Sequence, residues 1–61
     1  MRREGYIIEF VQNGSYTKVS AVDPVTLIEV SIVGATNAGR EHLTHLAVRK
    51  LEYMMAKKGH K

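Results

Sequence analysis

The chain has 61 residues, no cysteine and a formal net charge of +3, with a calculated pI of about 9.5. This length predicts one small domain whose core supplies only about 3–5 kcal/mol, and the lack of cysteine excludes disulfides and thiolate metal ligands. Because the sequence has no signal-like apolar segment and no membrane span, we expect a cytoplasmic protein without a membrane partner. Association with a second protein or a second copy is the remaining source of stability.

The first strand is predicted at residues 6–11, where β-branched and aromatic residues gather. Asn13-Gly14 follows and predicts a two-residue type I′ turn, because asparagine and glycine both tolerate the positive φ that this turn needs. The turn places Glu9 opposite Lys18 on one face of the hairpin and apolar residues of both strands on the other. The apolar face is therefore predicted to form the core.

Asp23-Pro24 opens the second turn, since proline fixes φ and the aspartate side chain bonds nearby amides. A loop of two or of four residues keeps Ile28 and Val30 on the inner face. The four-residue loop could require positive φ at Leu27, which a branched apolar residue adopts poorly; this is a reason to doubt the longer loop, and the sequence leaves the length of the loop open. The short connections predict an antiparallel meander in which the strands lie in chain order.

One amphipathic helix is predicted at residues 38–58, where apolar side chains recur at spacings of three and four, and Asn37 is the expected N-cap. Such a helix is about 30 Å long, whereas strands of six or seven residues span about 20–23 Å and three strands are about 10 Å across. We therefore expect the helix to overhang the sheet. Met54 and Met55 near its end then either close the core or contact a second copy.

The predicted fold class is α+β, with a three-stranded antiparallel β-meander followed by one C-terminal α-helix packed on one face (β-β-β-α). The predicted boundaries are a single domain at residues 1–61, with a leader at 1–5, the sheet at 6–33 and the helix at 38–58. One helix covers one face of the sheet, so the other face is predicted to be open.

The open face of the predicted sheet is more apolar than a purely solvated face needs. Its predicted members are Ile7, Glu9, Val11, Tyr16, Lys18, Ser20, Val22, Glu29, Ser31 and Val33. The face is interpreted either as a partner surface or as ordinary exposed β-branched residues. The candidate protein interface consists of Ile7, Val11, Tyr16 and Ser31 on this face, together with Met54 and Met55 at the helix end.

Catalysis, a cofactor and a metal site are not expected. The loop 34–39 has glycines at the spacing of a phosphate-binding loop, but Arg40 and Glu41 follow where that motif has lysine and a hydroxyl residue. His42 and His45 supply two metal ligands at most, without a third or a fourth. No grouping of serine, histidine and aspartate suggests a nucleophile, so the chain is not predicted to be an enzyme.

The charge is unevenly divided along the chain. Residues 1–39 carry three basic and four acidic residues, giving −1, whereas residues 40–61 carry six basic and two acidic residues, giving +4. A basic helix face can meet phosphate, although basic residues at helix ends also serve ordinary solubility. The alternative function is weak nucleic-acid binding through His42, Arg49 and Lys57.

Four separated strings are distributed over residues 5–53: GYIIEF at residues 5–10, YTKVSAVDP at 16–24, EVSIVG at 29–34 and AVRKLEY at 47–53. Together they resemble a family of short bacterial proteins, about 60 residues long, classed as a domain of unknown function. The resemblance implies no activity. Leu27 departs from the glycine that it leads us to expect after Asp-Pro-x-Thr.

The sequence leaves the function, the partner and the pathway unknown. The leading hypothesis is a small non-catalytic protein-interaction or regulatory module that binds another protein or its own copy.

Overall fold

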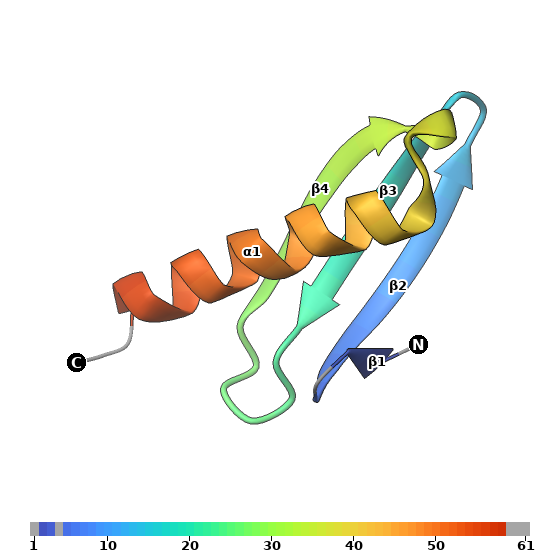
Figure 1. Cartoon of the computed structure of the whole chain (residues 1–61). Helices are drawn as coiled ribbons and strands as arrows, with labels where there is room; N and C mark the ends of the chain where they lie inside the picture. The colour runs from blue at the N-terminus through green and yellow to red at the C-terminus, as the bar shows by residue number, and fades with distance from the viewer. Residues whose placement is uncertain (1, 4, 59–61) are drawn as a thin grey trace.

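The computed structural model describes residues 2–3 and 5–58, which form an antiparallel sheet and a long helix (Figure 1). The elements are β1 (Arg2–Arg3), β2 (Tyr6–Asn13), β3 (Tyr16–Val22), β4 (Glu29–Ala35), the 3₁₀ helix η1 (Thr36–Ala38) and α1 (Arg40–Lys58). The strand order is β1-β2-β3-β4, and α1 crosses one face of the sheet. This confirms the predicted α+β class, the meander and the C-terminal helix.

The structure adds a short strand in the segment that the sequence predicts as a leader. In the ladder between β1 and β2, Arg3 lies opposite Tyr6. The reversal between the two strands uses Gly5 at a φ of 93°, a conformation that favours glycine. The sheet therefore has four strands, of which β1 covers only one end of β2.

The first hairpin has the predicted faces but a different register. Asn13 lies opposite Tyr16, so the turn residues are Gly14 and Ser15 rather than Asn13 and Gly14, and Glu9 faces Ser20 instead of Lys18. Positive φ is then needed only at Gly14, where it is 65°, which is the pattern of a type II′ turn. Because the register shift is two residues, every side chain keeps its face.

The second hairpin uses the longer, four-residue loop, so the doubt that positive φ at Leu27 raised against this loop is not borne out. The Asp23 amide donates to the Ile28 carbonyl (3.0 Å) and the Leu27 amide donates to the Asp23 carbonyl (2.7 Å). The Asp23 carboxylate accepts bonds from the Val25 amide (3.1 Å) and the Thr26 hydroxyl (3.0 Å). These bonds hold the Leu27 backbone at a φ of 66°. The Leu27 side chain is 75% exposed, so its burial does not contribute to holding this conformation.

Leu27→Gly is expected to stabilise the fold by about 1 kcal/mol, because the left-handed conformation costs a side-chain-bearing residue about 1–2 kcal/mol and the exposed side chain loses little burial. Urea unfolding measures the change in midpoint at constant slope. The matched control is Val25→Gly, at a second exposed loop position without positive φ, which is expected to lose about 0.5–1 kcal/mol. Equal losses in the two variants would contradict the strain at Leu27.

The core lies between α1 and the covered face of the sheet. Its buried members are Ile8, Val19, Ala21, Val30, Leu43, Ala47, Val48 and Leu51. Leu43 packs so closely on β4 that its Cδ2 lies 2.5 Å from the place that a Cβ on Gly34 would take. A glycine at this point therefore allows the first turn of the helix to approach the strand.

The helix begins two residues later than predicted. The Thr36 amide donates to the Ser15 carbonyl (2.8 Å), and the Thr36 hydroxyl lies 3.0 Å from the Thr17 hydroxyl. These bonds fix η1 to the end of the first hairpin, so Asn37 lies within η1 and not at the N-cap of α1. Gly39 then redirects the chain at a φ of 97°, and its carbonyl accepts from the Leu43 amide at 3.1 Å.

Thr44→Val is expected to stabilise the fold by about 1 kcal/mol, because Thr44 is 2% exposed and its hydroxyl has no hydrogen-bond partner among the residues that the structure describes. The control is Thr17→Val. The Thr17 hydroxyl is also buried but bonds to Thr36, so this variant is expected to lose about 1 kcal/mol. Thermal or urea unfolding measures both, and a loss of stability in Thr44→Val would show that the hydroxyl is satisfied in solution.

Candidate interaction surface

The face of the sheet opposite α1 is not covered by any element that the structure describes (Figure 1). We call it the open face. The two ladders arrange its side chains in four rows across β2, β3 and β4, because alternate residues of a strand point to one side. From the β1 end to the first hairpin turn, the rows are Ile7–Val22–Glu29, Glu9–Ser20–Ser31, Val11–Lys18–Val33 and Asn13–Tyr16–Ala35.

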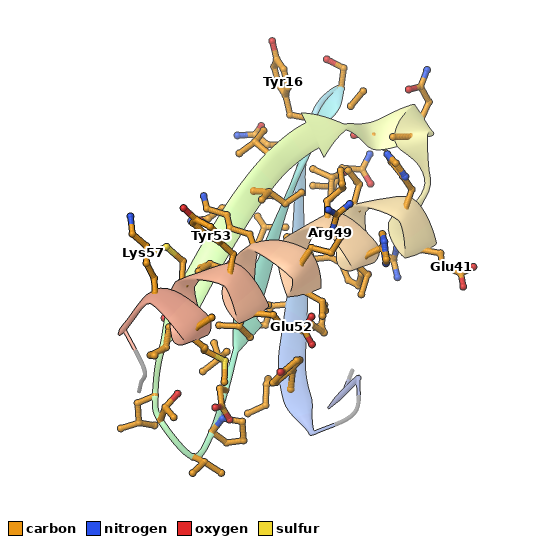
Figure 2. All side chains as sticks on the ribbon, turned by 60° about the vertical axis from the view of Figure 1, so that its left-hand side comes forward. Tyr16, Glu41, Arg49, Glu52, Tyr53 and Lys57 are labelled. Carbon is orange, nitrogen blue, oxygen red and sulfur yellow. The ribbon has the colours of Figure 1, made fainter. Side chains whose placement is uncertain are left out.

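The third and fourth rows form an apolar end around Tyr16. Val11, Tyr16 and Val33 are exposed here, and with Asn13 and Lys18 they line an open hollow of about 340 Å³. Figure 2 shows the Tyr16 ring projecting away from the body of the protein and from the helix. An exposed tyrosine beside two valines offers both apolar area and a hydroxyl to a partner.

A second hollow of about 540 Å³ lies on the other side of Tyr16, toward the start of the helix. It is lined by Ser15, Tyr16, Val33, Gly34, Ala35, Thr36 and Asn37. Tyr16 and Val33 border both hollows. This end of the open face is therefore hollowed on two sides of one aromatic ring.

Charge is distributed unevenly over the open face. Glu29 is in the first row and Glu9 in the second, whereas Lys18 is in the third row, between Val11 and Val33. Glu29 and Glu9 thus lie toward the β1 end, where Arg2 of β1 pairs with Ile7, and Lys18 lies in the apolar end. Both signs lie on one surface, which suits contact with a surface of the same pattern.

The structure places four of the predicted interface residues together on the open face: Ile7, Val11, Tyr16 and Ser31. The other two, Met54 and Met55, are partly buried and pack against the core on the helix side of the sheet. Figure 1 shows the end of α1 extending past β4, as the helix length predicts. The six residues therefore belong to two separate surfaces.

The edge of β4 has a feature that sequence reasoning missed. The Lys50 ammonium donates to the Ser31 carbonyl at 3.0 Å. Lys50 reads in the sequence as one of several basic helix residues, and nothing in the spacing predicts which strand it reaches. The contact depends on the direction in which α1 crosses the sheet, and the sequence does not specify that direction.

The candidate nucleic-acid residues lie on the outer side of α1. Figure 2 shows Arg49 and Lys57 on the helix with Glu41 and Glu52 nearby along it, and His42 is exposed. The Lys57 ammonium lies 5.8 Å from the centroid of the Tyr53 ring. Basic and acidic side chains are thus interspersed here instead of forming one cationic stripe.

Metal ligands do not gather in the described residues: no three His, Cys, Asp or Glu side chains come together there. His42 and His45 are both exposed on α1. The helices that the structure describes also lack the combination of length and apolar character needed to cross a membrane.

The fold and the open face define a small α+β domain with one sheet face left uncovered by its described elements. The chain belongs to the family described as a domain of unknown function, DUF6898, which matches residues 3–58. This confirms the resemblance to such a family. No curated protein and no solved structure matches the chain.

Proposed function

We propose that this chain is a small, cytoplasmic, non-catalytic protein-interaction module that works through the open face of its sheet. The observation that carries this proposal is the cluster of exposed apolar side chains at Val11, Tyr16 and Val33, beside two hollows. Exposed tyrosine and valine in contact with water are the groups that gain most from burial against a partner. A chain without cysteine suits a reducing compartment.

Two features support a contact by side chains of the face. The apolar end carries few charges, as the centres of protein interfaces do, and the polar row of Glu9, Ser20 and Ser31 flanks it. The hydrogen-bonded strands below hold these side chains at fixed spacings, so a partner meets a preformed surface. The module therefore needs no large rearrangement to bind.

The competing function, weak nucleic-acid binding through the basic helix, has less support. The Arg40 guanidinium lies over the Phe10 ring at 4.8 Å, and the Lys50 and Lys57 ammonium groups contact Ser31 and Tyr53 of the same chain. To bind phosphate, these cationic groups would have to give up or weaken their contacts within the chain. Several free cations on one face would favour phosphate far more.

Tyr16→Glu is expected to abolish association through the open face, because the carboxylate would be desolvated beside Val11 and Val33. Tyr53→Glu is the matched control: both tyrosines are 63% exposed, but Tyr53 lies on the outer side of α1. Sedimentation equilibrium over a range of concentrations measures self-association of wild type and both variants. If Tyr16→Glu associates as wild type does, the open face is not the surface.

Binding to a labelled nucleic-acid duplex is expected to be undetectable at physiological salt, and any binding at low salt is expected to fall steeply as salt rises. Fluorescence anisotropy measures it for wild type and for Arg49→Glu/Lys57→Glu. Tight binding that the double variant removes would favour the nucleic-acid function over the proposed one.

A further inference from the structure

We infer that the open face binds a second copy of this chain, packed face to face with its strands reversed, so that Lys18 of each copy meets Glu9 of the other. This inference rests on the proposed function, because it uses the same face, and it adds the partner and the arrangement. Two sheets packed in this way leave the two α1 helices on the outside, which gives four layers.

The open face is favoured over the edge of β4 as the contact between copies. The bond from the Asp23 amide to the Ile28 carbonyl makes these residues a hydrogen-bonded pair of the β3–β4 ladder. Because such pairs alternate, Ser20 and Ser31 form a non-bonded pair and the Ser31 carbonyl points away from β3. Lys50 binds that carbonyl, and a lysine on an edge is a common block to edge pairing.

In a symmetric face-to-face dimer whose strands stay roughly aligned, the two-fold axis in the plane of the interface runs either parallel or perpendicular to the strands. An axis parallel to the strands stacks each row on the same row of the second copy. Lys18, at the centre of β3, would then lie on Lys18 of the second copy. Like charges at such a contact repel, so this arrangement is disfavoured.

An axis perpendicular to the strands, through the middle of the face, exchanges the second row with the third and the first row with the fourth. Lys18 then lies over Ser20 of the second copy, and Glu9 of that copy is on the neighbouring strand of the same row. The two sheets are about 10 Å apart, a gap that lysine and glutamate side chains bridge together. The symmetry forms this contact twice.

One apolar pair agrees with the same arrangement. Val22 in the first row comes to lie over Tyr16 of the second copy, in the fourth row. Val11 and Val33 lie beside the central cation, where they exclude water from it. The reversed packing thus brings Val22 onto Tyr16 and Lys18 close to Glu9, each twice, whereas Val11 faces Glu9 and Ile7 faces Asn13 of the second copy.

The area predicts a reversible dimer. Three strands of seven or eight residues cover a footprint of about 14 by 23 Å, which belongs with the smaller specific interfaces that bury less than about 1,200 Å² in total. Such a dimer is expected to dissociate on dilution. The stability of the fold is then expected to rise with protein concentration.

The test uses charge reversal at the two proposed partners. Lys18→Glu sets acid against acid at both contacts, and Glu9→Lys sets base against base, so each variant is expected to self-associate at least about tenfold more weakly than wild type. An equimolar mixture of the two variants restores opposite charges at both contacts. The mixture, and the single chain carrying both changes, are therefore expected to dimerise as wild type does.

The controls are Lys57→Glu and Glu41→Lys, which change the net charge by the same amounts on the outer side of α1. They are expected to leave the dissociation constant unchanged. Sedimentation equilibrium measures all variants, and circular dichroism checks that each is folded. If each single variant associates weakly while their mixture and the doubly changed chain dimerise as wild type does, the reversed packing is supported.

Two outcomes separate this inference from the proposed function. If Tyr16→Glu abolishes association but the mixture of charge variants does not recover it, the open face is the interface and the reversed arrangement is wrong. If wild type stays monomeric at every concentration, the second copy is excluded as the partner, and the proposed function is left with a different protein on the same face.

Discussion

The structure depends on the contact between one helix and one side of a four-stranded sheet. Leu43, Ala47 and Leu51 of α1 are buried against Val19 and the apolar side chains around it. No described element supplies the same cover for the other side (Figure 1). The side chains there must therefore tolerate water and still carry the β-branched and aromatic residues that favour strands.

This constraint links stability to function in a small domain. A chain of 61 residues buries only about 60% of its unfolded surface, so each buried contact is a large fraction of the stability. The fold nevertheless holds Leu27 in a left-handed conformation and buries the Thr44 hydroxyl without a hydrogen-bond partner in the described part of the chain. A partner that binds only the folded state raises the stability of such a domain by mass action.

The period of two in the strands made the faces predictable, although it could not determine the register. Turns at Asn13-Gly14 and at Gly14-Ser15 differ by a two-residue shift of the ladder, which leaves every side chain on the same face. The hydrophobic pattern is therefore equally satisfied by both. The alternation of side chains along each strand is enough to predict which residues lie on the open face, whereas the pairing of Glu9 with Ser20 depends on which residues form the turn.

Other features depended on contacts that a single sequence does not specify. Leu27 adopts positive φ because the hydrogen bonds of Asp23 outweigh its local preference. The start of α1 is set by Thr36, which bonds to the first hairpin. The bonds of Asp23 lie within one loop, whereas the bonds of Thr36 are tertiary contacts, as is the bond from Lys50 to Ser31, which requires the crossing direction of the helix.

The most direct measurement of the central claim, that the open face is where this domain interacts, is the change of valine and leucine methyl NMR shifts with protein concentration. Association through the open face is expected to change the shifts of Val11, Val22 and Val33 and to leave those of Leu46, on the exposed side of α1, constant. Changes confined to Leu46 and the helix, with the open-face methyl groups constant, would contradict it.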